Sequence, residues 1–108
     1  MSIENFTGVY REYYNKKKPI IKSEVFMLNG KKEGVYKQYL ENGNIYKEIN
    51  YIDDKINGTY KIYNYNGHLC TEVNYIDDKI NGTYKTYHDN KQLFLEVNYI
   101  NDKMNGKK

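Results

Sequence analysis

The sequence predicts an all-β fold: an elongated, single-layer, twisted antiparallel β-meander built from about four tandem β-hairpin repeats. First, the string NYIDDKINGTYK begins at Asn50 and recurs 24 residues later, at Asn74. Second, the 108 residues include no alanine, the best helix former, whereas tyrosine, isoleucine, valine and threonine are plentiful. Third, asparagine and glycine punctuate these segments at regular intervals, as tight turns require.

The repeats extend over nearly the whole chain. A glycine opens each of the later units and a glutamate holds a fixed place inside each: Gly34, Gly58, Gly82 and Gly106, and Glu48, Glu72 and Glu96. We therefore divide the chain into a lead-in, residues 1–7, and a repeat domain, residues 8–108, with units 8–33, 34–57, 58–81 and 82–105. The first unit is irregular, with a surplus of two residues inside the lysine-rich stretch 16–22.

Each unit is expected to be one hairpin. Asn42-Gly43 and Asn66-Gly67 lie between apolar-rich segments, which predicts two-residue type I′ turns. Such a turn sets the cross-strand pairs of the second unit: Lys37 with Glu48, Tyr39 with Tyr46, Tyr36 with Ile49 and Gly34 with Tyr51. The same register pairs Lys61 with Glu72 and Lys85 with Glu96.

Units are expected to connect through a second tight turn. At Asp53-Asp54 this turn pairs Tyr51 with Ile56 and Ile49 with Gly58. The glycine that opens each unit faces Tyr51, Tyr75 or Tyr99, and we expect it to leave room for the ring to lie over bare backbone.

Alternation along the strands sorts the side chains onto two faces. The packed face collects aliphatic residues and the repeated tyrosines: Tyr36, Leu40, Ile45, Ile49, Tyr51, Tyr60, Ile62, Leu69, Val73, Tyr75, Tyr84, Leu93, Leu95, Val97 and Tyr99. The wet face collects the lysine–glutamate pairs and a row of rings. We take its rings and lysines as the candidate interaction surface: Tyr39, Tyr46, Tyr63, Tyr87, Phe94, Lys37, Lys61 and Lys85.

Composition argues against several classes of site. No apolar run approaches the length of a membrane span and the N-terminus lacks a signal-peptide layout, so we expect a cytoplasmic protein. Asp53-Asp54 supplies too few ligands for a metal ion and is followed by Lys55. His68, Cys70 and His88 have no carboxylate placed to orient them. We therefore expect no enzyme activity, no metal site and no cofactor.

The unit pattern Gly-x-Tyr-Lys-x-Tyr-x-x-Asn-Gly-x-Leu-x-x-Glu-x-x-Tyr-x-x-Asp-Lys-x-x-Gly resembles the variant form of the MORN repeat, over residues 8–106. Asp54 and Asp78 stand where that family often has glycine, which bears on the turn between units. The resemblance implies a single-layer, twisted, elongated sheet with an aromatic-lined groove. It also implies scaffolding, dimerisation and, in some members, contact with acidic lipid headgroups.

We expect a non-enzymatic module for protein–protein interaction or scaffolding. The alternatives are homodimerisation, acidic-lipid binding through the lysines of residues 16–22, and the antitoxin-like inhibition that the resemblance implies for some bacterial proteins. The wet rings could instead only stiffen cross-strand pairs. Nucleic acid is not expected, because a glutamate opposite each lysine cancels the charge that phosphates would need.

Overall fold

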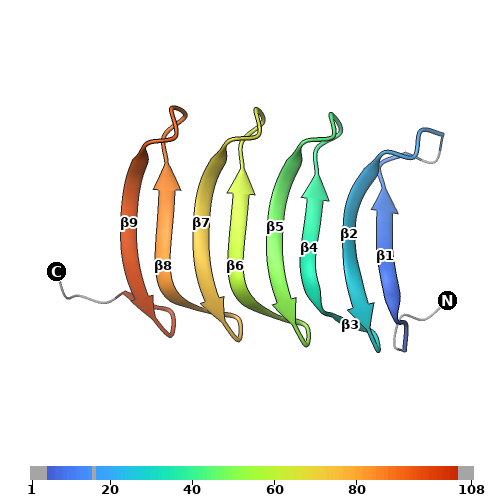
Figure 1. Ribbon diagram of the computed structural model, residues 1–108, viewed down its shortest axis with the longest axis horizontal. Coiled ribbons are helices and arrows are strands. Elements are labelled where there is room, and N and C mark those ends of the chain that lie inside the picture. The colour runs from blue at the N-terminus through green and yellow to red at the C-terminus, as the bar shows by residue number, and fades with distance from the viewer. Residues whose placement is uncertain (1–4, 16, 105–108) are drawn as a thin grey trace.

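The computed structural model describes residues 5–15 and 17–104, which form one antiparallel sheet with no helix (Figure 1). Lys16 and Gly106, both considered above, lie outside the described residues. The strands are β1 (Gly8–Tyr13), β2 (Ile21–Leu28), β3 (Lys31–Lys32), β4 (Gly34–Tyr39), β5 (Ile45–Ile52), β6 (Lys55–Tyr63), β7 (Leu69–Ile76), β8 (Lys79–Tyr87), β9 (Leu93–Ile100) and β10 (Lys103–Met104). The predicted all-β meander is confirmed.

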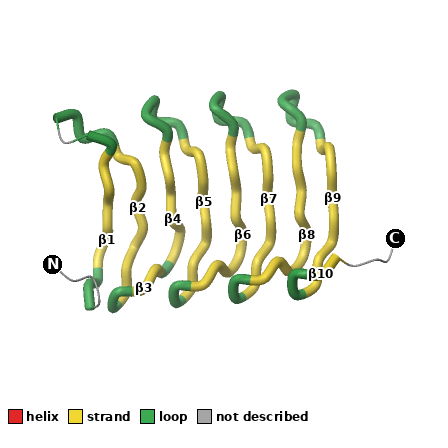
Figure 2. The backbone as a smooth tube through the Cα atoms, turned by 180° about the vertical axis from the view of Figure 1, so that it is seen from behind, coloured by secondary structure: helices red, strands yellow, loops and turns green. Residues whose placement is uncertain are grey.

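The sheet is a single layer. Its strands follow one another in chain order from β1 to β10, with only the short β3 off the main path, where it pairs with β2. The Cα atoms span 50 × 32 × 13 Å, and Figure 2 shows the hairpins side by side with nothing stacked on them. The buried apolar residues all come from the strands themselves: Val25, Met27, Ile49 and Val73.

The hairpin loops differ from the prediction. The loop Glu41-Asn42-Gly43 has three residues, closed by the Leu40 N–H, which donates to the Asn44 carbonyl at 2.8 Å. Only Gly43 in it has a positive φ, 92°, so a type I′ turn is excluded. Nearby, the strand pairing skips Tyr46, and Tyr39 pairs with Ile45 instead of Tyr46. Beyond that bulge the predicted pairs hold, including Lys37 with Glu48 and Gly34 with Tyr51.

The type I′ geometry occurs instead at the turns between units. Asp53 and Asp54 have φ of 54° and 68°, and Asp77 and Asp78 have 48° and 69°. Aspartate tolerates this left-handed region better than most residues, although the conformation costs about 1 kcal/mol or more. The aspartates thus adopt the backbone that glycine would adopt at these positions.

A pair of hydrogen bonds, which we name the clasp, holds each of these turns against the preceding unit. Asp78 donates its N–H to the Ile56 carbonyl at 2.9 Å, and its carboxylate accepts the Ile56 N–H at 2.7 Å. Asp54 is joined to Lys32 in the same way, and Asp102 to Ile80. The paired aspartates are therefore structural, and the clasp repeats along one border of the sheet.

The register between units also differs from the prediction. Tyr51 pairs with Ile56 as expected, but Ile49 pairs with Tyr60 and not with Gly58. The reason is a bulge: β6 carries two more residues than β5 between these pairs. Because the excess is even, the two faces stay in phase across the junction.

The glycines that open the units have a different role from the predicted one. They do pair with Tyr51, Tyr75 and Tyr99, but their φ angles of 102–114° suit glycine alone. A Cβ added at Gly82 would lie 3.0 Å from the Cβ of Asn74, not against a tyrosine ring. At Gly34 a Cβ would meet nothing within 4 Å. The glycines are thus required by backbone conformation, and Gly82 also by the asparagine beside it.

Substitutions of Asp78 test the clasp. We expect Asp78→Ala to lower the free energy of unfolding by about 2–3 kcal/mol, because it loses a hydrogen bond and keeps a strained φ. Asp78→Gly relieves the strain but still loses the hydrogen bond, so it should cost about 1 kcal/mol. Asp78→Asn keeps a side-chain oxygen that can accept the hydrogen bond and also tolerates the positive φ, so it should cost less. Urea denaturation measures all three, and equal losses for Ala and Asn would contradict the clasp.

A second pair of variants tests the glycines. Gly34→Ala should cost about 1–2 kcal/mol, from the positive φ alone. Gly82→Ala should cost more, about 2–4 kcal/mol, because the added methyl group also displaces Asn74. Thermal or urea unfolding of the two variants gives the difference in their free energies of unfolding. An equal loss in both variants would show that Asn74 moves aside at no cost.

Candidate functional site

A row of alternating charges crosses the wet face. Its members are opposite one another in adjacent strands: Arg11, Glu24, Lys37, Glu48, Lys61, Glu72, Lys85 and Glu96. We call this the charge row. Every predicted lysine–glutamate pair lies in it, and the bulge between units additionally sets each lysine beside the glutamate of the preceding unit. Each strand from β1 to β9 except the short β3 contributes one member.

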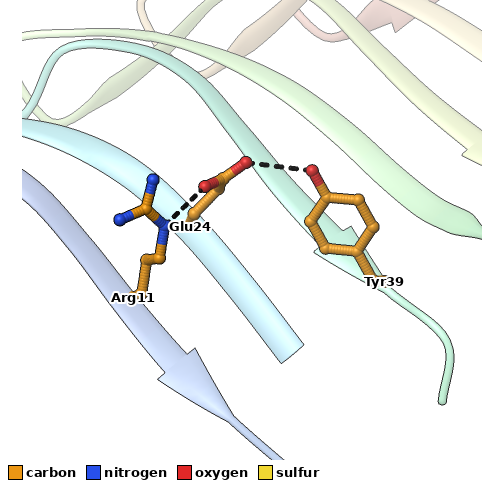
Figure 3. A network of polar contacts seen from close by, with 3 residues as sticks. All are labelled: Arg11, Glu24 and Tyr39. Carbon is orange, nitrogen blue, oxygen red and sulfur yellow. Dashed lines mark hydrogen bonds and ion pairs between the residues drawn. The ribbon is translucent and has the colours of Figure 1, made fainter. Parts of the chain in front are cut away.

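At its N-terminal end the charge row is tied by direct contacts (Figure 3). The Arg11 Nε donates to Glu24 Oε2 at 2.9 Å, and the Tyr39 hydroxyl donates to Glu24 Oε1 at 2.9 Å. The Arg11 guanidinium, followed by the Tyr39 hydroxyl, holds the pKa of Glu24 below its ordinary value. Both oxygens of Glu24 are therefore occupied from within the chain.

The next unit repeats half of this arrangement. The Tyr63 hydroxyl donates to Glu48 Oε1 at 2.6 Å. Burial, and then this hydrogen bond, raises the pKa of Tyr63 to about 12. Tyr39 and Tyr63 are thus held against glutamates and are not free rings. Between Tyr87 and Glu72, both described, the corresponding hydrogen bond is not formed.

The lysines of the charge row are not ion-paired with the glutamates opposite them. Among the described residues, the ion pairs within 4.0 Å are Arg11–Glu24 and Lys31–Asp53. Lys37, Lys61 and Lys85 therefore stand opposite their glutamates without an ammonium–carboxylate distance within 4.0 Å. The glutamates stand opposite the lysines as predicted, but Glu24 and Glu48 form their hydrogen bonds with Arg11, Tyr39 and Tyr63.

The remaining predicted surface residues do not form one continuous row. The ring of Tyr46 lies 5.5 Å from Lys47 Nζ, which also lies 5.9 Å from the ring of Tyr60 on the packed face. Tyr46 is the bulge residue and is skipped by the pairing, so it does not stand opposite Tyr39 as predicted. Three residues that were predicted on the packed face lie on the wet face, because the bulge pairs them with Tyr39, Tyr63 and Tyr87. They are Ile45, Leu69 and Leu93. Phe94 is 66% exposed and stacks edge-on with His88.

The packed face carries a second alternating row, of tyrosines and aliphatics. Tyr10 is opposite Val25 between β1 and β2, and the members that are opposite one another across β4 to β9 are Tyr36, Ile49, Tyr60, Val73, Tyr84 and Val97. Neighbouring rings also meet, such as Tyr60 and Tyr75 at 5.9 Å between centroids. These rings cover Ile49 and Val73, which explains how a single layer buries any side chain.

The other candidate chemistry remains dispersed. Across residues 5–15 and 17–104, no group of three or more histidine, cysteine, aspartate or glutamate side chains could hold a metal ion. Cys70 is part of β7, and its Sγ lies 3.8 Å from the carbonyl oxygen of His68, just before that strand. No helix able to cross a membrane occurs in the described part of the chain.

Two of the shallow hollows on the wet face are each lined by more than one member of the charge row. One, of about 150 Å³, is lined by Val35, Glu48, Asn50, Thr59 and Lys61. The other, of about 340 Å³, opens between β1, β2 and β4, and we call it the N-terminal hollow. Its apolar lining consists of Val9, Phe26 and Val35, together with Val25. Its charged lining consists of three members of the charge row, Arg11, Glu24 and Lys37. The sequence prediction missed it, although its signal is the replacement of the usual threonine and asparagine by valine and phenylalanine.

The family model described as MORN repeat variant matches three tandem segments of the chain, residues 32–53, 56–77 and 80–101. Each segment has 22 residues, so together they cover 66 of the 108. The match includes the charge row from Lys37 to Glu96 and leaves out residues 8–31 of the irregular first unit. No curated protein and no solved structure matches the chain.

The raised pKa of Tyr63 predicts alkaline instability. As pH rises from 10.0 toward about 12, the unfolded chain loses the phenol proton first, so stability should fall through this window. Tyr63→Phe should flatten that fall, while Glu48→Gln should flatten it less, since burial is the larger cause. Urea denaturation at stepped pH measures the slopes. An unchanged slope in Tyr63→Phe would contradict the assignment.

Proposed function

Because this chain belongs to the MORN repeat variant family, we propose that it is a non-enzymatic interaction module that holds a protein partner on its wet face. MORN repeats are commonly modules that bind proteins or membranes. The finer assignment, to a protein partner and to this face, is our proposal. It rests on how the wet face distributes its charge.

The main support is that the acidic residues at the start of the charge row are hydrogen-bonded within the chain, whereas its lysines form no ion pair among the described residues. Glu24 and Glu48 already accept hydrogen bonds from Arg11, Tyr39 and Tyr63. Lys37, Lys61 and Lys85 have no carboxylate within 4.0 Å among the described residues. A partner can therefore gain charge-assisted hydrogen bonds from these ammonium groups without first breaking an ion pair.

Rigidity and openness add to this support. The clasps fix each unit on the one before it, so the face is preorganised and little entropy is lost when a partner binds. The layer is only 13 Å thick in its Cα trace, so both faces are accessible over the full 50 Å length. Such a surface suits extended contact with a macromolecule better than enclosure of a small substrate.

Site-specific photo-cross-linking tests the proposal. A photoreactive amino acid replaces Lys61, on the wet face, and in a matched control replaces Tyr65, a loop residue that is 71% exposed. In the cells that produce the protein, we expect a discrete adduct from position 61 and none from position 65. An adduct of twice the 13.0 kDa chain mass would identify a second copy as the partner.

Two outcomes would contradict this function. The first is equal, diffuse labelling from positions 61 and 65, which indicates random collision. The second is labelling from neither position together with sedimentation on phosphatidylserine vesicles that is lost when Lys18 and Lys22 become glutamine. That result would favour the lipid alternative, for which the exposed lysines near the β1–β2 loop are the relevant charge.

A further inference from the structure

The N-terminal hollow breaks the polar pattern of the wet face. Val9, Phe26 and Val35 are 49%, 42% and 44% exposed, although each belongs to a well-paired strand. Val9 lies directly opposite Phe26, and the Glu33 N–H donates to the Phe26 carbonyl at 2.9 Å, which holds β2 against the start of β4. Three apolar side chains thus lie together in open solvent, on a sheet that has a second face for burying such groups.

The third and fourth units show that this fold does not require those side chains. At the positions equivalent to Val9 and Phe26 they carry threonine and asparagine, as in the pairs Thr59 with Asn74 and Thr83 with Asn98. At the junction of the third and fourth units these polar side chains hydrogen-bond: the Thr83 hydroxyl donates to Asn74 Oδ1 at 2.7 Å. Val35 is itself paired with Asn50, so the change from apolar to polar occurs at β4 and β5.

The residues that line the hollow have an excess of positive charge. Arg11 and Lys37 stand on either side of Glu24, which gives two cations to one carboxylate within the lining. Glu48 lies opposite Lys37 but outside the lining, and it accepts a hydrogen bond from Tyr63. Both oxygens of the Glu24 carboxylate are engaged, by Arg11 and Tyr39. The Lys37 ammonium has no carboxylate within 4.0 Å among the described residues, so the group that complements this lining is an anion.

We propose that the N-terminal hollow is the docking site for an extended segment of a partner protein, in which an apolar side chain is followed by aspartate or glutamate. The apolar side chain covers Phe26, Val9 and Val35, and the carboxylate reaches Lys37. This inference rests on the proposed function and gives it a location and a ligand chemistry. It also explains why the first unit departs from the repeat.

Selection from a displayed library of random peptides tests the proposal, with the full chain as bait. We expect enriched peptides to share an apolar residue followed by an acidic one. The variant Phe26→Asn with Val35→Thr gives the hollow the residues of the later units, and should fold and weaken binding of those peptides at least about tenfold. Ile76→Thr removes an apolar side chain that is 51% exposed outside the hollow, and should leave binding unchanged.

Charge reversal gives an independent measurement. Lys37→Glu should lose the acidic peptides, and a selection on it should enrich apolar residues followed by lysine or arginine. Circular dichroism checks that each variant keeps its sheet, and a variant that unfolds is replaced by Phe26→Ser or Lys37→Gln, for which the same loss is expected.

Three results would overturn the inference. They are enrichment of no peptide family, enrichment of peptides that bind the Phe26→Asn, Val35→Thr variant as tightly as the original chain, and binding to phosphatidylserine vesicles but not to peptides. The second result together with a discrete adduct from position 61 would leave the proposed function standing and place its site elsewhere. The absence of both peptides and adducts would remove the proposed function as well.

Discussion

The clasp between each inter-unit turn and the preceding unit is the constraint on which the rest of this structure depends. In each clasp one aspartate forms hydrogen bonds with both the backbone N–H and the backbone carbonyl of a single residue in the preceding unit. The three aspartates are Asp54, Asp78 and Asp102. Each hydrogen bond contributes only about 0.5–1.5 kcal/mol, but the two together fix a single register. The left-handed backbone of the aspartate is tolerated because these bonds require it.

The fixed register produces both faces at once. Because alternate residues point to opposite sides, the pairing that aligns Lys61 with Glu48 also aligns Tyr60 with Ile49. On one side tyrosine rings cover the aliphatic residues between them, and on the other the charges alternate. A 13 Å layer cannot bury side chains between two sheets, so neighbouring side chains within one face must cover each other. Tyrosine suits this use, since its ring packs while its hydroxyl stays in water.

Repetition and irregularity have different consequences here. The repeated residues explain the sheet, and the same contacts recur from unit to unit, so they cannot by themselves identify a binding site. The first unit keeps the register but changes the chemistry, with Val9 and Phe26 opposite one another where the third and fourth units pair threonine with asparagine. Arg11 also takes the place of lysine and forms an ion pair with Glu24, whereas Lys37, Lys61 and Lys85 have no carboxylate within 4.0 Å among the described residues. The chemical departure from the repeat is therefore concentrated at the N-terminal end of the sheet.

The sequence by itself determined the repeat period, the hairpin units, the lysine–glutamate pairs within them and the assignment of most side chains to a face. These features follow from local alternation and from short hairpins, in which few registers are possible. Only the tertiary structure decided the three-residue loops, the bulge at Tyr46, the clasp of Asp78 on Ile56, and the preference of Glu24 for Arg11 and Tyr39 over Lys37. Each of these depends on which atoms of neighbouring strands or units come within hydrogen-bonding distance, and the spacing of residues along the chain does not specify that distance.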